Sequence, residues 1–317
     1  MRTGLVCALA ALLVVTSAGC SGGGSAPASG PASTPVTATS SSVSAAPEQS
    51  YQAPAMATVE FHPDAAVGEG DVLVDLSCTA QGYVGVSAKS DKRLKFRTQI
   101  GEIQYTYNLP NDGTPTFYPL QSGDGDYTFI VFENTHDTNY IKKYTTQAAV
   151  ALESEFAPFL RSSQFVDYTA DSACVAKAAE LASSAADQVG AVANIYDYIV
   201  GHIAYDYDKA RTVESGYLPT PDETLSTGKG ICFDYAALAA AMLRSQGIPA
   251  KLITGYVSPN NVYHAWNMVW LEETGWITVE FKAPANQWSR VDMTFAASGT
   301  DADFIGDGSN YTDYLTY

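Results

Sequence analysis

The spacing of apolar residues changes near residue 159, and that change divides the chain into two folded parts. Before it, polar and apolar residues alternate, as they do from Arg93 to Ile100, which is the pattern of strands buried on one face. After it, apolar residues recur at helical spacing, at positions 192, 195, 196, 199 and 200. Because the chain has 317 residues, it has room for two domains of ordinary size.

The first part, residues 55–158, is predicted to be an immunoglobulin-like β-sandwich. Polar and apolar residues alternate along five segments: 71–76, 82–88, 93–100, 103–108 and 127–133. Turn-forming residues separate them at 111–113 and 123–126. About six to eight short strands over about a hundred residues are typical of such a sandwich. Its histidines, His62 and His136, stand alone in the sequence, and no catalytic constellation is visible around them.

The second part, residues 159–317, is predicted to be an α+β domain. Helical patterns come first, over 172–186, around 192–200 and from Cys232 onward. Gly247 follows the third helix where a C′ glycine belongs, and Pro249 comes after it. Strand patterns then occupy 251–257, 263–271, 276–281 and 288–295. Helices followed by antiparallel strands are the order of an α+β fold.

The first 54 residues are expected to carry no fold of their own. Residues 1–20 have one Arg, an apolar run too short to span a bilayer, and small residues before Cys20, as in a bacterial lipoprotein signal. A plain secretory signal is the alternative interpretation. Of residues 21–50, 26 are Ser, Thr, Pro, Ala or Gly, so we expect 21–54 to be a disordered linker. The chain is then exported and anchored by lipid at Cys20 to the outer face of the bacterial membrane.

The charge balance excludes several classes of partner. Asp and Glu number 34 against 17 Lys and Arg, which gives a net charge of −17. DNA, RNA and anionic membrane surfaces all need clustered positive charge, so they are not expected as main partners. There is no HExxH, no CxxC pair and no nucleotide-binding glycine motif. We therefore expect no metal and no cofactor.

Of the five cysteines, Cys232 is the candidate nucleophile. Cys7 leaves with the signal and Cys20 is the candidate lipid site, so Cys78, Cys174 and Cys232 remain. An odd number in an exported chain indicates one free thiol, and we predict a disulfide between Cys78 and Cys174. The alternative is that each of these two cysteines is a small core residue. Cys232 begins a helix, where the helix dipole favours a thiolate. From these residues alone, a small buried cysteine at a helix start is an equally good interpretation.

Five short motifs resemble the bacterial transglutaminase-like superfamily, which has a papain-like thiol fold. In order they are GKGICFDYA at 228–236, LRSQGIPA at 243–250, Gly-Tyr at 255–256, His-Ala-Trp at 264–266 and WSRVDMT at 288–294. The resemblance covers about residues 190–295. Met293 stands where proline is usual in the last motif. The order of the motifs is more specific than any one of them.

The resemblance implies a catalytic triad. Cys232 would attack an amide carbonyl, His264 would exchange protons with it, and a carboxylate would orient the imidazole. Asp292 and Glu280 both follow a Trp-x-x-Val pattern; we favour Asp292 because Thr294 completes the family ending. This choice requires the 288–295 strand to lie beside the His264 strand. The backbone N–H of Cys232 and Tyr205 are the candidate oxyanion donors, with Tyr205 equally interpretable as a core residue.

The sequence therefore predicts an extracytoplasmic thiol enzyme that acts on amide bonds of a peptide or protein, such as a cell-wall or surface protein. Acceptance of the acyl group by water gives a peptidase or amidase, and acceptance by an amine gives a crosslinker. Hydrolysis is the more frequent expectation for bacterial members of the superfamily. A catalytically silent domain that serves as a cell-surface binding protein is the alternative from another class.

Overall fold

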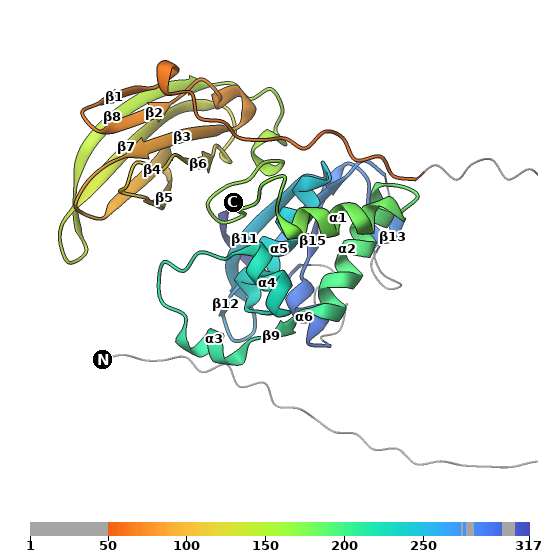
Figure 1. Ribbon diagram of the computed structural model, residues 1–317. Helices are drawn as coiled ribbons and strands as arrows, with labels where there is room; N and C mark the ends of the chain where they lie inside the picture. Colours follow the sequence, from red (N-terminus) through yellow and green to blue (C-terminus); the bar gives the residue numbers. More distant parts are fainter. Residues whose placement is uncertain (1–49, 274, 277–281, 300–307) are drawn as a thin grey trace, which may run out of the picture. The chain divides into compact units, whose positions relative to one another are not determined.

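A computed structural model describes residues 50–273, 275–276, 282–299 and 308–317 (Figure 1). The predicted signal and most of the predicted linker lie outside these residues. The fold is α+β, with strands dominating the first part and helices followed by strands in the second. No helix among the described residues is both long and apolar enough to cross a bilayer.

The first part contains two antiparallel four-stranded sheets. One sheet has the order β1-β2-β3-β6 and the other β5-β4-β7-β8. Their strands are β1 (Val67–Glu69), β2 (Val72–Asp75), β3 (Tyr83–Ala88), β4 (Leu94–Ile100), β5 (Ile103–Leu109), β6 (Thr116–Pro119), β7 (Gly125–His136) and β8 (Asn139–Val150). Short 3-10 helices η1 (Pro63–Ala65), η2 (Thr79–Gln81) and η3 (Ala157–Phe159) flank them. The five predicted strands are present; an immunoglobulin-like connection of the two sheets stays a prediction.

Alternating burial explains why these strands pair. Along β4 the side chains of Leu94, Phe96 and Thr98 are buried, whereas those between them are partly exposed. The ring of Phe96 lies 4.6 Å from that of Tyr118 on β6, so the inner faces of the two sheets meet. Burial of such aromatic side chains is the main stabilising contribution to this core.

Six helices are described in the second part: α1 (Ala173–Ser183), α2 (Gln188–His202), α3 (Tyr207–Thr212), α4 (Pro221–Thr227), α5 (Cys232–Ser245) and α6 (Met293–Ala297). The sequence predicted α1, α2 and α5. Helices α3 and α4 were not predicted, because the polar stretch that contains them, with Pro219, Pro221, Gly228 and Gly230, has the composition of a loop. Asp206 caps α3 by accepting a hydrogen bond from Lys209 N, and Pro221 begins α4 with a φ already suited to a helix.

The strands of the second part form an antiparallel sheet in the order β15-β12-β11-β16. Its members are β11 (Ala250–Val257), β12 (Val262–Leu271), β15 (Gln287–Val291) and β16 (Tyr311–Thr316); β9 (Ala204–Tyr205) pairs with β10 (Lys229–Gly230), and β13 (Gly275–Trp276) with β14 (Lys282–Ala283). Helix α5 packs against β12, where Asn267 Nδ2 donates to the carbonyl of Ala236 at 3.0 Å. The predicted 288–295 strand ends at Val291, because the Asp292 side chain caps α6.

Arg244 joins three segments of the chain inside the core. Its guanidinium is fully buried and donates to the carbonyls of Ala250, Arg161 and Tyr317 at 2.8–3.0 Å. Burial lowers the pKa of Arg244 to about 10. These bonds hold the end of α5, the segment before α1 and the last described residue together.

The predicted disulfide between Cys78 and Cys174 is wrong, because both cysteines are free. Cys78 is buried beside His62 in the β part, whereas Cys174 lies in α1, where its backbone N–H donates to Asp222. Each thiol fills a small space in its own surroundings, as free cysteines in cores commonly do. His62, expected to stand alone, lies next to Asp75 and Cys78.

The end of the expected linker contacts the second part. Tyr51 N–H donates to Ala185 O at 2.7 Å, and the Tyr51 hydroxyl donates to Gln246 O at 2.8 Å. Pro54 lies so close to Gly247 that a Cβ there would come within 2.1 Å of Pro54 Cγ. Gly247 also has a positive φ of 73°, so both its conformation and its neighbour favour glycine.

Candidate active site

Cys232 is the first residue of α5, and a short strand pair fixes the backbone before it. Strands β9 and β10 are parallel, with Ala204 N donating to Gly228 O at 2.8 Å and Asp206 N donating to Gly230 O at 2.9 Å. Gly230 has no room for a side chain, since a Cβ would lie 2.6 Å from Asp234 Cβ. The helix start that carries the thiol is therefore held to an upstream segment by backbone hydrogen bonds.

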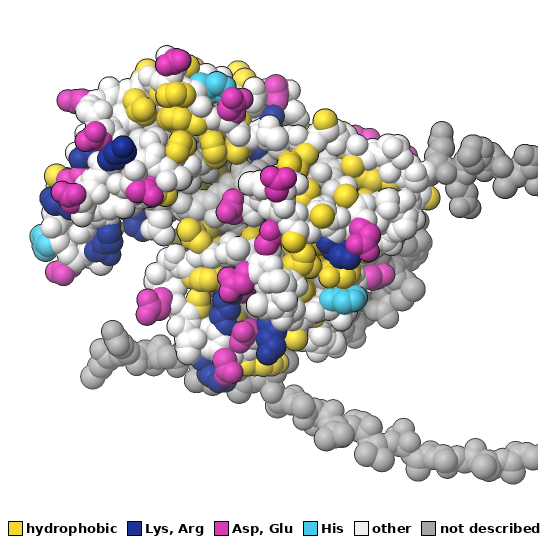
Figure 2. Space-filling model, viewed as in Figure 1, with side chains coloured by type: hydrophobic (Ala, Val, Ile, Leu, Met, Phe, Trp, Pro, Cys, Tyr) yellow, Lys and Arg dark blue, Asp and Glu magenta, His cyan; other side chains and the backbone are white. Residues whose placement is uncertain are grey.

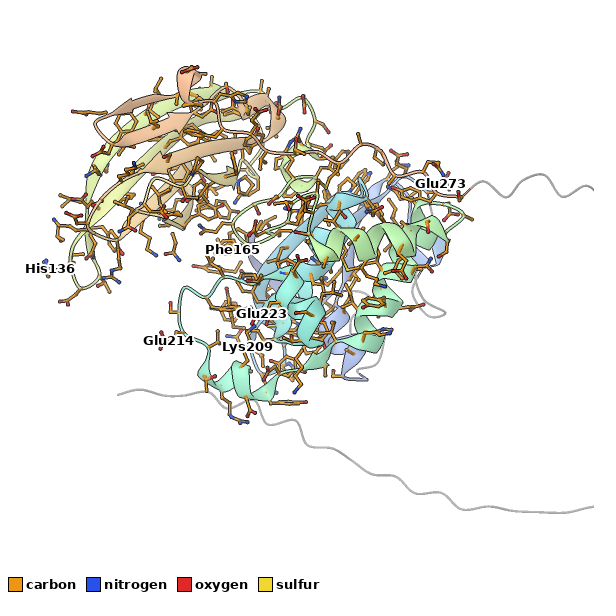
Figure 3. The ribbon with its side chains drawn as sticks, viewed as in Figure 1. His136, Phe165, Lys209, Glu214, Glu223 and Glu273 are labelled. Atoms are coloured by element: carbon orange, nitrogen blue, oxygen red, sulfur yellow. The ribbon has the colours of Figure 1, made fainter. Side chains whose placement is uncertain are left out.

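A buried carboxylate stabilises the same turn. Asp234, fully buried in the first turn of α5, accepts from Ile231 N at 2.8 Å. Lys209 Nζ on α3 lies 2.8 Å from its Oδ2, and the Tyr217 hydroxyl donates to its Oδ1 at 2.6 Å. Figure 3 labels Lys209 in this region. The charge of Asp234 is thus paired, and α3 and the following loop are joined to the start of α5.

His264 and Asp292 lie next to each other on neighbouring strands. His264 is on β12, Asp292 follows β15, and these strands pair with Asn267 opposite Val291. The pairing is the strand order that the choice of Asp292 required. His264 Nε2 lies 2.7 Å from Asp292 Oδ2, and both side chains are buried. Such a short contact between an imidazole and a carboxylate fixes the orientation of the ring.

Asp292 is itself held by two further hydrogen bonds. Its Oδ1 accepts from Phe295 N at 2.9 Å, which is the cap of α6. Its Oδ2 also accepts from the hydroxyl of Tyr311, on β16, at 2.9 Å. Three donors, from Phe295, Tyr311 and His264, therefore replace the water that the buried carboxylate has lost.

The surroundings of His264 favour its protonated form. Burial alone lowers the pKa of His264, but the negative charge of Asp292 and the side chain of Cys232 outweigh it and raise the pKa to about 10. Cys232 contributes by charge and by a side-chain hydrogen bond. The ring of Phe295 stacks on the imidazole at 4.3 Å. Since Nε2 faces Asp292, Nδ1 is the nitrogen that can exchange a proton with Cys232.

This arrangement has the chemistry of a nucleophilic thiol. Cys232 lies beside an imidazole whose pKa is raised and at the N-terminus of α5, which is the setting in which nucleophilic cysteines are found in proteins. The thiol is partly exposed, whereas His264 and Asp292 are buried behind it. A substrate carbonyl could therefore reach the sulfur without displacing the imidazole.

The structure brings together Cys232, His264 and Asp292. Tyr205, the candidate second oxyanion donor, lies opposite Gly230 in the strand pair that leads to Cys232, and its role in catalysis stays a prediction. Glu280, the alternative carboxylate, lies outside the described residues. Sequence reasoning missed Tyr311; it lies 19 residues after Asp292 in a segment with several tyrosines, so no spacing singled it out.

A thiol at a helix start and a buried imidazole–carboxylate pair on the adjoining antiparallel sheet are the groups that nucleophilic thiol chemistry requires. Residues 175–293 match the family model of the transglutaminase-like superfamily, and all three side chains lie in that range. The chain therefore contains a transglutaminase-like domain.

Two curated relatives align with parts of the chain. UPF0252 protein MJ1282 of Methanocaldococcus jannaschii is 31% identical over 115 residues, which cover 32% of this chain and 33% of the relative. A protein-glutamine gamma-glutamyltransferase of Pseudomonas aeruginosa is 35% identical over 71 residues, which cover 19% of this chain and 11% of the relative. The chain thus spans a third or less of the length of these relatives.

Solved structures are similar at low sequence identity. A protein from Cytophaga hutchinsonii that was proposed to be a cysteine protease is 17% identical, with 74% of this chain and 79% of that chain covered and a TM-score of 0.41. Red sea bream transglutaminase is 14% identical, with 67% and 48% covered and a TM-score of 0.27.

Proposed function

We propose that this protein is a thiol enzyme that acts on amide bonds of a peptide or protein through Cys232, His264 and Asp292. The observation that carries the proposal is the 2.7 Å contact between His264 Nε2 and Asp292 Oδ2, with Cys232 contributing to the raised pKa of the same imidazole. A nucleophile, a proton carrier and an orienting carboxylate are then all in place.

The first half of the proposed reaction forms a thioester. The Cys232 thiolate attacks the amide carbonyl carbon, and the Cys232 backbone N–H at the start of α5 stabilises the developing oxyanion. Imidazolium His264 gives its Nδ1 proton to the leaving amine as the C–N bond breaks. Asp292 keeps the imidazole in the tautomer that this transfer requires.

The second half releases the acyl group. Water or an amine attacks the thioester carbonyl, neutral His264 accepts its proton at Nδ1, and the sulfur leaves as thiolate. Release to water makes the protein a peptidase or amidase, and release to an amine makes it a crosslinker. Hydrolysis is the outcome we favour, with a cell-wall or surface protein as the substrate class.

The proposal includes the location of the enzyme. The apolar run before Cys20 supports export and lipid attachment at that residue, and an immunoglobulin-like sandwich then precedes the thiol domain. On the face shown in Figure 2, Lys and Arg side chains are scattered among Asp and Glu, which agrees with a protein rather than a nucleic acid as substrate. Metabolic labelling with a fatty-acid probe tests this point: Cys20→Ala should remove the label.

The main experiment combines alkylation with activity. Purified protein is treated with iodoacetamide at neutral pH, and labelled cysteines are located by mass spectrometry. We expect Cys232 to react faster than a model thiol, while buried Cys78 and Cys174 react slowly. Glutamine-donor peptides are then offered with and without an amine acceptor. Ammonia or peptide release without the acceptor indicates hydrolysis, and incorporation of the amine indicates transfer.

Two variants complete the test. Cys232→Ala should remove activity and leave the unfolding midpoint unchanged, because the side chain is only partly buried; Cys174→Ala is the matched control and should keep activity. A Cys232 that labels no faster than a model thiol, in a protein that turns over no peptide, would instead support the catalytically silent binding domain.

A further inference from the structure

Three possible metal ligands lie close together in the β part, outside the candidate active site. They are His62, just before η1; Asp75, the last residue of β2; and Cys78, just before η2. One ligand atom from each lies within 4.8 Å of the other two. The residues come from separate segments, so no motif spacing in the sequence connects them.

One ring nitrogen of His62 faces both of the other donor atoms. His62 Nδ1 lies 3.2 Å from Asp75 Oδ2 and 3.7 Å from Cys78 Sγ. Tetrahedral Zn²⁺, with bonds of about 2.0 Å to nitrogen and oxygen and about 2.3 Å to sulfur, holds N and O about 3.3 Å apart and N and S about 3.6 Å apart. The observed separations thus already match those around such an ion.

The same geometry argues against a second catalytic triad. In a triad the thiol and the carboxylate face different ring nitrogens, whereas here Asp75 and Cys78 both face Nδ1 of His62. The other ring nitrogen, Nε2, lies 3.6 Å from Glu60 Oε2. A carboxylate near the second ring nitrogen is the usual outer partner of a metal-binding histidine.

The site is built around the carboxylate. Asp75 is 1% exposed; its Oδ1 accepts from Ser77 N at 2.9 Å, and its Oδ2 from His62 N at 2.7 Å. These bonds leave the lone pair of Oδ2 that now faces His62 Nδ1. Ser77 Oγ donates to Asp75 Oδ1 at 2.6 Å and lies 3.2 Å from His62 Nδ1 and 3.7 Å from Cys78 Sγ, so a further oxygen is next to both donors.

We propose that His62, Asp75 and Cys78 form a zinc site, with an oxygen of Ser77 or water as the fourth ligand. Nitrogen, sulfur and carboxylate oxygen together suit Zn²⁺ better than Ca²⁺ or Mg²⁺, which take oxygen ligands. Binding releases the Cys78 thiol proton to solvent and shifts the His62 proton to Nε2, toward Glu60. A thiolate, a carboxylate and Zn²⁺ form a neutral assembly, which suits a buried position.

The ion would join the segment before η1 to the turn between β2 and β3. Two of its three protein ligands, Asp75 and Cys78, are buried, so the ion would connect these segments inside the β part. Zinc should therefore raise the melting temperature of the protein, since a ligand that binds only the folded state stabilises it.

The test uses the full chain carrying Cys232→Ala, so that zinc cannot bind the thiol of the candidate active site. Zn²⁺ affinity is measured by competition with a chromophoric chelator, and Co²⁺ is added as a spectroscopic probe. We expect one Zn²⁺ per chain and a Co²⁺–thiolate charge-transfer band. In that background Cys78→Ser should remove the band and weaken zinc binding about 100-fold or more.

His62→Gln is the second variant and should weaken zinc binding similarly; its side chain is 41% exposed, so the fold tolerates the change. The matched controls are Cys174→Ala and His136→Gln, the latter at the β7–β8 turn (Figure 3), and both should bind zinc as the parent does. Absence of stoichiometric binding in the parent, or an affinity in His62→Gln within about two-fold of it, overturns the proposal.

Discussion

The hydroxyl of Tyr311 lies 2.9 Å from Oδ2 of Asp292. The same oxygen faces His264 Nε2 at 2.7 Å, so two donors from different strands share one acceptor. Tyr311 is on β16 and reaches a carboxylate that follows β15, at the other edge of the sheet. Tyr311 therefore holds the Asp292 carboxylate in the position from which the carboxylate orients the imidazole of His264.

Replacing Tyr311 by Phe should lower kcat/KM about ten-fold, because a hydrogen bond to a charged group is lost while the ring remains. The change should also alter the pH profile, since Oδ2 of Asp292 then interacts with His264 alone. Tyr314→Phe, on the same strand but 65% exposed, is the matched control and should leave both unchanged. A Tyr311→Phe enzyme with the parent rate and pH profile would show that the tyrosine has no positioning role.

Asp292→Asn should lower kcat/KM by about 10³–10⁴ at neutral pH, because the imidazole loses its orienting charge. The charge of Asp292 contributes to raising the pKa of His264 to about 10, so the alkaline fall in activity should move to lower pH. Rates of Cys232 alkylation across pH measure this directly. The matched control is Asp313→Asn, a half-exposed carboxylate near Arg290. An unchanged alkaline limb would contradict the pairing.

Stability should depend on the charge of His264. The pKa of His264 is raised from 6.5 in the unfolded chain to about 10 in the fold, so the folded protein binds the proton more tightly. Protonated His264 therefore adds on the order of a few kcal/mol to the free energy of unfolding. This contribution is complete below about pH 6.5 and is lost as pH rises to about 10. The free energies of unfolding of the parent and of His264→Gln, measured by urea denaturation, should become more similar as pH rises over this range. His202 is exposed, so His202→Gln is the control, and its free energy of unfolding should change with pH as that of the parent does.

Lys209→Met should destabilise the protein by about 3 kcal/mol, because it leaves the buried charge of Asp234 without its cation. Lys177→Met is the comparison: Lys177 pairs with exposed Glu180, three residues away on α1, and its loss should cost less than about 1 kcal/mol. Urea denaturation of both variants gives the two values. Equal costs would mean that the Lys209 pair contributes no more than a surface pair.

Two glycines should respond to alanine in opposite directions. Gly230→Ala places a Cβ 2.6 Å from Asp234 Cβ, so we expect the free energy of unfolding to fall by about 2 kcal/mol and the alkylation of Cys232 to become slower. Gly201→Ala, near the end of α2 and with no atom within 4 Å of its Cβ, should gain about 0.5–1 kcal/mol. Thermal unfolding measures both. A stable Gly230→Ala protein with fast labelling would show that this turn can move.

The sequence predicted the elements whose apolar spacing was regular. Helix α5 begins at Cys232 as expected, because glycines precede it and a C′ glycine ends it. The strand after Trp288 was predicted too long, because Asp292 is followed by residues that fit a strand equally well. The helix begins there because Phe295 N donates to the Asp292 side chain and Ala296 N donates to the Asp292 carbonyl.

Interactions between distant segments could not be predicted in this way. Tyr311 reaches Asp292 only because β16 joins the sheet beside β11. Asp234 could be placed on a helix from the sequence, but its partner Lys209 comes from a helix that was not predicted. Likewise His62 and Cys78, 16 residues apart, become neighbours only when β2 ends at Asp75.

Arg244 has a consequence for the order in which the domain can form. Its three carbonyl acceptors come from positions 83 residues before it, 6 residues after it and 73 residues after it. Burying a guanidinium without acceptors costs several kcal/mol, so α5 cannot take its final place until Tyr317 is available. Until β16 has joined the sheet, the guanidinium lacks its acceptor at Tyr317, and the helix that carries Cys232 stays in an unfinished core. The placement of the nucleophile therefore depends on a strand that is far from it in the sequence.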